Sequence, residues 1–214
     1  LQNGPMLLGP GGGLLWFKAT PKNQMATDFR VQSYQGQPVL TWWQGYSGAG
    51  LGFGRDVIND THYRQIAVVN AANGLRADLH EFTLTPQGTA LITAYNPVYA
   101  DARSARGAAH QVVQDSVVQE IDVKTGLVLF QWDSLDHVPV SYSYVPAPRS
   151  GNTPFDYFHI NGVDLDHDGN LLVSARNHWT AYKISRVSGQ VLWNLSGKRS
   201  SFRMGAGARF AFQH

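Results

Sequence analysis

Three histidines recur at one position of a repeated pattern in the sequence. His80 and His159 each stand where a short strand is expected to begin, and His214 stands at the matching place of a later copy. A weaker, earlier copy carries Gln32 there. Arg176 ends the strand expected after His159, and an antiparallel hairpin would bring it back beside that histidine. Because imidazole can be a base, a nucleophile or a ligand near neutral pH, these residues are the first candidates for chemistry.

Two kinds of chemistry fit three imidazoles and one guanidinium. Three histidines could hold zinc and leave one coordination position open. Alternatively, arginine and histidine could donate hydrogen bonds to a tetrahedral anion while one histidine acts as the nucleophile. Arg176 favours the second, because a fixed cation suits sulfate or phosphate and repels a metal ion. A histidine at a strand start can also simply hydrogen-bond a backbone carbonyl, and this interpretation stays open for each one.

Short apolar runs provide the elements that must position these side chains. The sequence has 22 Gly and 10 Pro, and between them lie runs of four to seven residues, which is the length of a strand. The clearest runs are Gly13–Phe17, Pro38–Trp43, Gln65–Val69, Ala90–Ala94, Leu127–Trp132, Asn170–Ser174 and Gln190–Trp193. Residues 100–118 are predicted to form a long loop with one helical turn, and Gly45–Arg55 a flexible loop.

The strand pattern repeats along the chain. After His80 and again after His159 come a strand, a turn closed by glycine and an apolar strand, followed by an amphipathic strand and a second tight turn. These second turns are Lys124–Gly126 and Val187–Gly189, and the strands after them end on Trp132 and Trp193. Phe210–His214 is predicted to start the next copy.

Four-stranded units repeating every roughly 40–50 residues indicate a β-propeller. We therefore predict an all-β fold, with about three complete blades and a partial blade at each end; a β-sandwich is the alternative. Residues 1–214 would be a single incomplete propeller domain that continues beyond both ends in the intact protein. A chain ending on the first strand of a blade would expose an unpaired edge. Association with the missing blades or with another chain is accordingly expected.

Composition and charge exclude several classes of protein. The chain is 43% hydrophobic and 15% charged, with a net charge of +2, which argues against disorder and against a nucleic-acid binder. Cysteine is absent, so disulfides, cysteine-ligated metals and thiol nucleophiles are excluded. No run of 18 apolar residues predicts a membrane span.

Several motifs together resemble one enzyme family. The chain is similar to the arylsulfotransferases, in particular to the secreted, propeller-built branch that does not use the nucleotide sulfate donor. The segments that carry the resemblance are Asp78–Phe82, Pro86–Leu91, Glu120–Asp122, Thr125–Gly126, Trp132, Asp136–Val138, Asp156–Asn161, Asp166–Arg176, Val191–Trp193, Gly197–Arg199 and Phe212–His214.

The resemblance implies a six-bladed propeller that binds an aryl sulfate in its central channel. It implies that His214, in the Gln-His piece, takes the sulfo group and passes it to a phenol. His159 and Arg176 would hold the sulfuryl oxygens, and His80 matches an earlier histidine of the family. The resemblance also implies a secreted or periplasmic protein.

Three further residues are expected to contact the substrate: Asn161, Tyr157 and Phe158. Aryl sulfate and phenol are the expected partners, and neither a metal nor a cofactor is expected. Two other functions stay open. One is a non-catalytic propeller that binds ligands on its face, and the other is a metal-dependent hydrolase that uses the channel histidines.

Overall fold

The computed structural model describes residues 2–214, which group into two compact units. The first unit contains the chain up to Ile92 together with Glu120–Leu129. The second contains Thr93–Gln119 and Phe130–His214. Each unit is described by itself, and the single propeller domain stays a prediction.

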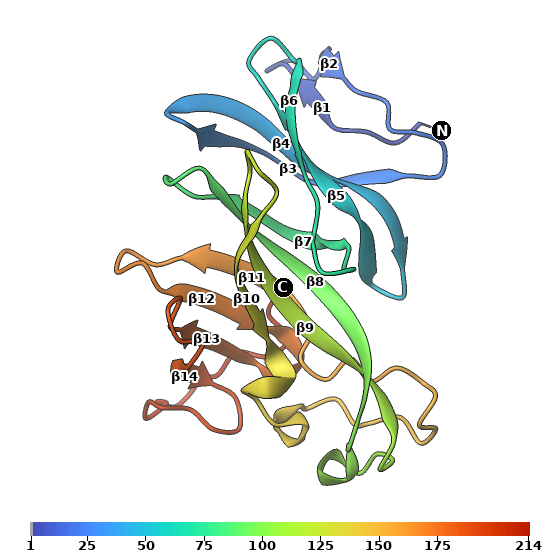
Figure 1. Cartoon of the computed structure of the whole chain (residues 1–214), viewed down its shortest axis with the longest axis vertical. Helices are drawn as coiled ribbons and strands as arrows, with labels where there is room; N and C mark the ends of the chain where they lie inside the picture. Colours follow the sequence, from blue (N-terminus) through green and yellow to red (C-terminus); the bar gives the residue numbers. More distant parts are fainter. Residues whose placement is uncertain (1) are drawn as a thin grey trace. The chain divides into compact units, whose positions relative to one another are not determined.

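The first unit is built of antiparallel strands (Figure 1). They are β1 (Met6–Leu8), β2 (Leu14–Phe17), β3 (Met25–Tyr34), β4 (Gln37–Gly48), β5 (Leu51–Asn59), β6 (Gln65–Val69) and β7 (Ala77–Leu84). Strands β1 and β2 form a separate ribbon, whereas β3, β4, β5 and β7 are neighbours in one sheet and β6 pairs with β5.

Trp43 anchors the hydrophobic core of the first unit. Its ring is buried, and its indole Nε1–H donates to the carbonyl of Ala77 at 2.8 Å, so that its one polar atom is satisfied. The buried residues that pack in the same cluster are Val39, Ile58, Val69, Ala77, Phe82, Leu84, Ala90, Ile92, Ile121 and Val123.

Strands β8 (Thr89–Ala100), β9 (Gln111–Asp122) and β10 (Val128–Asp133) are each divided between the two units. The sheet that contains them has the order β10-β9-β8-β7-β5-β4-β3. Gly126, in the turn between β9 and β10, has a φ of 74°, a conformation that glycine adopts without strain. The tight turn predicted at Lys124–Gly126 is confirmed.

The second unit contains a four-stranded sheet in the simple order β11-β12-β13-β14. Its strands are β11 (Ile160–Leu165), β12 (Leu171–Ala175), β13 (Thr180–Ile184) and β14 (Val191–Ser196), shown in orange and red in Figure 1. Buried and half-buried residues alternate along β12 and β13, as expected for strands with one face on a core. This up-and-down order is the one expected for a propeller blade.

Four short 3-10 turns complete the second unit. They are η1 (Arg103–Ala105), η2 (Ser134–Asp136), η3 (Val140–Tyr142) and η4 (Arg176–His178). The prediction of an all-β fold is confirmed by these antiparallel sheets, and the number of blades stays a prediction. Among the residues that the structure describes, no helix has the length and apolar character needed to cross a membrane.

The structure corrects three local predictions. Gly45–Arg55 is not a flexible loop but the hairpin of β4 and β5, and β5 itself was not expected. Residues 111–117 extend β9, although the predicted helical turn is present as η1. Phe210–His214 forms no strand. In the first two cases glycines and polar side chains obscure the strand pattern in the sequence, although neighbouring strands supply the hydrogen bonds. In the third, side-chain contacts of Gln213 and Asn161 hold the segment instead of a strand ladder.

Candidate active site

His159 stands directly before β11 in a left-handed backbone conformation. Its φ is 53°, which costs a non-glycine residue of the order of 1–2 kcal/mol. The ring nitrogen Nδ1 lies 2.5 Å from Asp156 Oδ2, and the two side chains are 12% and 28% exposed. The carbonyl of His159 accepts a hydrogen bond from the backbone N–H of Arg176 at 3.0 Å. Two predicted site residues therefore meet at one hairpin.

Arg176 begins η4 and is held by two contacts. Its Nη1–H donates to Asn177 Oδ1 at 3.0 Å, and its guanidinium carbon lies 4.8 Å from the centre of the Phe212 ring. The remaining N–H groups of this guanidinium have no acceptor among the residues that the structure describes. An oriented cation with unused donors suits an oxyanion.

His214 lies beside His159. The two ring centres are 5.7 Å apart. Gln213 anchors the segment, because its Nε2 donates to Ser174 Oγ at 3.3 Å and to the carbonyls of Ala175 and Thr180 at 3.1 Å each. The second unit therefore brings His159, Arg176 and His214 into one neighbourhood.

Asn161 holds the same segment from the other side. Its Nδ2–H donates to the carbonyl of Gln213 at 2.6 Å. The β11–β12 register shifts between Ile160 and Gly162, and such a bulge re-aims the side chain that it inserts. The contact with Gln213 shows Asn161 positioning the His214 segment, and its predicted contact with substrate stays a prediction.

Tyr157 and Phe158 are buried in the core of the second unit. Neither ring is exposed. The hydroxyl of Tyr157 donates to the carbonyl of Val138 at 3.3 Å, and the Phe158 ring stacks on Tyr182 with 5.5 Å between centres. Both side chains therefore belong to the core of the second unit, and their predicted contact with substrate stays a prediction.

His80 belongs to the first unit, on β7. Its Nδ1 contacts Asp78 Oδ2, and the side chains are 6% and 0% exposed. Asp78 also accepts hydrogen bonds from the backbone N–H of Gly52 and, at 3.1 Å, of His80. The role of His80 in the reaction stays a prediction.

Gln32, the residue that stands in the histidine position of the weaker repeat, connects strands. Its Nε2 donates to Thr41 Oγ1 and to the carbonyl of Phe82, each at 2.8 Å, and its Oε1 accepts from the N–H of Leu84 at 2.8 Å. Its amide is thus used to hold β3 beside β7.

His178 is a core residue although it lies two positions after Arg176. Burial lowers the pKa of His178 to about 3, so the ring is neutral near physiological pH. Its Nδ1 lies 2.9 Å from the Tyr182 hydroxyl. These surroundings are those of a structural residue.

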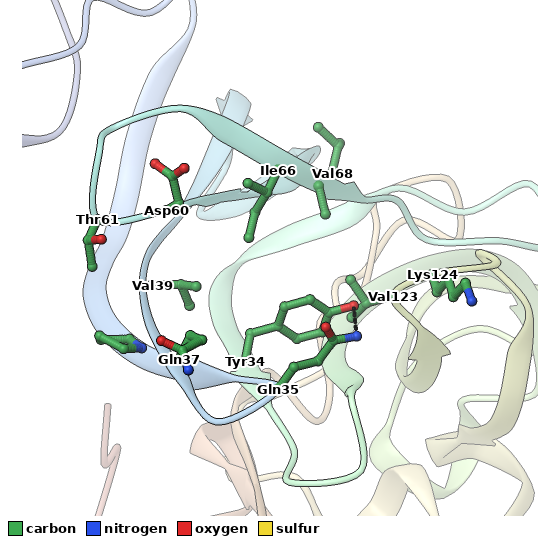
Figure 2. Close-up of a pocket in the computed structure, with 12 residues that line it drawn as sticks. Tyr34, Gln35, Gln37, Val39, Asp60, Thr61, Ile66, Val68, Val123 and Lys124 are labelled. Atoms are coloured by element: carbon green, nitrogen blue, oxygen red, sulfur yellow. Dashed lines mark hydrogen bonds between the residues drawn. The ribbon is translucent and has the colours of Figure 1, made fainter.

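A cavity of about 740 Å³ lies in the first unit (Figure 2). Figure 2 shows Ile66 and Val68 of β6 across from Tyr34 and Val39. Lys124 stands at its rim. The described lining residues include neither histidine nor arginine, so this cavity lacks the groups on which the predicted chemistry depends.

Sequence reasoning missed three supporting residues of the second unit. Asp156 contacts His159, Gln213 anchors His214, and the Tyr95 hydroxyl donates to the carbonyl of Ile160 at 3.0 Å. Asp156 and Gln213 lie inside the quoted segments, three residues before one histidine and next to the other. That proximity was the available signal, whereas nothing in the sequence places Tyr95 here.

Comparison with known proteins gives a family. The model of the family described as arylsulfotransferase (ASST) matches residues 30–214. No curated protein matches the chain.

Among solved structures, a protein of unknown function from Bacteroides caccae is 15% identical, with a TM-score of 0.48, over 92% of this chain and 56% of that one. The Dos1 propeller is 10% identical, with a TM-score of 0.49, over 94% of this chain and 43% of that one. The chain thus spans about half the length of these two structures.

Proposed function

Since the chain belongs to the arylsulfotransferase family, we propose that the protein transfers a sulfo group from an aryl sulfate to a phenol through a sulfo-histidine. The donor is an anion with an apolar ring, and the acceptor is a neutral phenol. The fold that we propose for the intact protein is a six-bladed propeller.

His214 is the nucleophile in this proposal. A nitrogen lone pair of its neutral ring attacks the sulfur of the donor, and the bond from sulfur to the aryl oxygen breaks. The electron pair of that bond leaves with the aryl oxygen as a phenolate. A phenolate is a tolerable leaving group, and neutral imidazole is a competent nucleophile near neutral pH.

Arg176 and His159 hold the sulfuryl oxygens while the group moves. The negative charge of those oxygens persists through the transfer, so donors that are fixed in advance stabilise the transition state without reorganising. The hairpin contact between the Arg176 N–H and the His159 carbonyl ties the two residues to each other.

The second step regenerates the enzyme. The oxygen of the acceptor phenol attacks the sulfur, the nitrogen–sulfur bond breaks, and its electron pair returns to the His214 ring. The acceptor loses its proton and the donor phenolate gains one, so no co-reactant is needed. His80 is proposed to assist on the basis of its family motif, and Asn161 by holding the Gln213 carbonyl.

The observation that supports the proposal most is the 5.7 Å separation of the His159 and His214 rings beside Arg176. The test mixes the full-length protein with a nitrophenyl sulfate and a second phenol. We expect release of nitrophenol together with the sulfated second phenol, and neither product from His214→Ala. If the wild type forms no sulfated phenol, the protein is not an arylsulfotransferase.

A further inference from the structure

Two of the three predicted site histidines, His80 and His159, have an aspartate on the same ring nitrogen. In the second unit, Asp156 Oδ2 lies 2.5 Å from His159 Nδ1; in the first unit, Asp78 Oδ2 contacts His80 Nδ1. An ionised carboxylate can only accept, so the proton of each contact is on Nδ1. The same relationship therefore occurs independently in both units.

Burial separates these two pairs from an ordinary surface contact. His167 also lies near an aspartate, with 2.6 Å between its Nδ1 and Asp166 Oδ1, but its side chain is 90% exposed. A pair in water is worth little, because solvent competes for both partners. The His159 and His80 rings are largely shielded, so their aspartates can fix the orientation of each ring.

Asp156 is not placed for stability alone. Its second oxygen, Oδ1, is buried and accepts no hydrogen bond from the residues that the structure describes. A buried acceptor without a partner costs roughly 1–3 kcal/mol. The left-handed backbone of His159 is a second unfavourable feature at the same site. Strained conformations of this kind cluster at functional sites, where the orientation of a side chain is part of the mechanism.

Asn177 joins this pair to the guanidinium. Its Nδ2–H donates to the backbone carbonyl of Asp156 at 2.6 Å, and its Oδ1 accepts from Arg176 Nη1 at 3.0 Å. The loop that carries Asp156 is therefore tied to the arginine that is proposed to meet the sulfo group.

We propose that Asp156 is a positioning residue. Its carboxylate accepts a hydrogen bond from Nδ1–H of His159 and so keeps the proton on that nitrogen, and Nε2 is the nitrogen presented to the sulfo group. Any additional proton on the ring is then carried at Nε2, where it can be donated to a sulfuryl oxygen. Asp78 does the same for His80. This inference rests on the proposed function for its catalytic meaning, but the state of the ring can be measured without turnover.

The first experiment is ¹⁵N NMR of the histidine side chains in the full-length protein without substrate, with His159→Gln used to assign its signals. We expect the His159 ring to carry a proton on Nδ1 in the wild type, and this preference for Nδ1 to be lost in Asp156→Asn. A wild-type ring protonated on Nε2 with a bare Nδ1 would overturn the proposal, whatever the activity.

The second experiment measures kcat, KM and the pH profile of Asp156→Asn, with Asp166→Asn as the matched control. We expect kcat to fall by at least about tenfold with little change in KM and an altered pH profile, and Asp156→Glu to restore part of the loss. The control should keep the wild-type values. An unchanged kcat and pH profile in a folded Asp156→Asn would contradict the proposal. If the wild type transfers no sulfo group, the proposed function fails, and the NMR result alone decides the role of Asp156.

Discussion

Arg176 is the residue whose surroundings match an anion most closely. It is half-buried, it rests against the Phe212 ring, and it keeps N–H donors without a protein acceptor among the described residues. A lysine could supply the charge but not the planar set of donors that arginine offers to a sulfo group.

We therefore expect Arg176→Ala to lower kcat/KM about 10²–10³-fold, the usual effect of removing a donor from an oxyanion site. Arg176→Lys should recover only a small part. Steady-state assays with an aryl sulfate give the values, and Arg149→Ala, at an exposed arginine, serves as the control. Equal losses in both variants would mean that overall charge, and not this position, governs the rate.

At the scale of single residues, the sequence predicts part of the candidate active site. His159 and His214 follow from repeated positions, because equivalent strand ends gather in a repeating fold, and Arg176 follows from the antiparallel hairpin after His159. Asp156 could not be assigned, since a polar residue in a turn carries no periodic signal. The burial of Tyr157 and Phe158 could not be foreseen either, because the left-handed turn at His159 breaks the alternation that would give their direction.

At the scale of the elements, the β4–β5 hairpin contains glycines where a larger residue would collide with neighbouring atoms. A Cβ on Gly54 would lie 2.3 Å from the backbone oxygen of Gln44 and 2.6 Å from Trp43 Cζ2, and one on Gly45 would lie 2.5 Å from Gly54 Cα and 2.8 Å from Trp43 Cζ2. The glycines therefore make room both for the close approach of the two strands and for the indole ring. The sequence predicted a loop here because glycine usually indicates chain flexibility. The sequence does not show that the Trp43 indole, on β4, packs against the glycine of the neighbouring strand β5.

Gly54→Ala should lower the free energy of unfolding by about 1–3 kcal/mol, the usual cost of overpacking. Gly48→Ala in the same hairpin is the matched control, since a Cβ there meets nothing within 4 Å. Its effect should stay within about 0.5 kcal/mol. Urea unfolding followed by tryptophan fluorescence measures both. Equal effects would show that backbone freedom, and not the indole ring, explains the glycine.

Strand β5 also carries a buried acid. Asp56 is fully buried, and neither carboxylate oxygen accepts a hydrogen bond from a residue that the structure describes. Burial raises its pKa well above the usual range, and the charges of Asp28 and Asp78 raise it further. Burial likewise raises the pKa of Asp28 to about 6. These protons favour the folded state at low pH, and the stability that they supply is lost as the pH rises from about 4 through the folded-state pKa values.

We expect the wild type to be less stable at about pH 8 than at about pH 5, and Asp56→Asn to lose less over that interval. Denaturant unfolding at the two pH values measures the difference. Asp164→Asn, at an exposed aspartate of β11, should keep the wild-type pH slope. Identical slopes for Asp56→Asn and the wild type would contradict a protonated Asp56.

For the whole molecule, the repeated strands were easier to predict than their assembly. The positions of β2, β6, β8, β10, β12 and β14 agree with the apolar runs, because alternation and flanking glycines are local signals. The number of blades depends on contacts between repeats, and no local pattern encodes it.

His80 is the predicted site residue that belongs to the first unit. His80→Ala should reduce kcat about 10²-fold while leaving the melting temperature of the protein unchanged. His62→Ala, at an exposed histidine of the first unit, should keep full activity. A fully active His80→Ala would show that His80 takes no part in the reaction.

The most direct test of the central claim is mass spectrometry of the protein after rapid mixing with an aryl sulfate and quenching in base. We predict one added SO₃ group on the peptide that contains His214, lost again when a phenol is added and absent from His214→Ala. Sulfo transfer to phenol at the wild-type rate by His214→Ala, or an SO₃ group on another residue, would contradict the account.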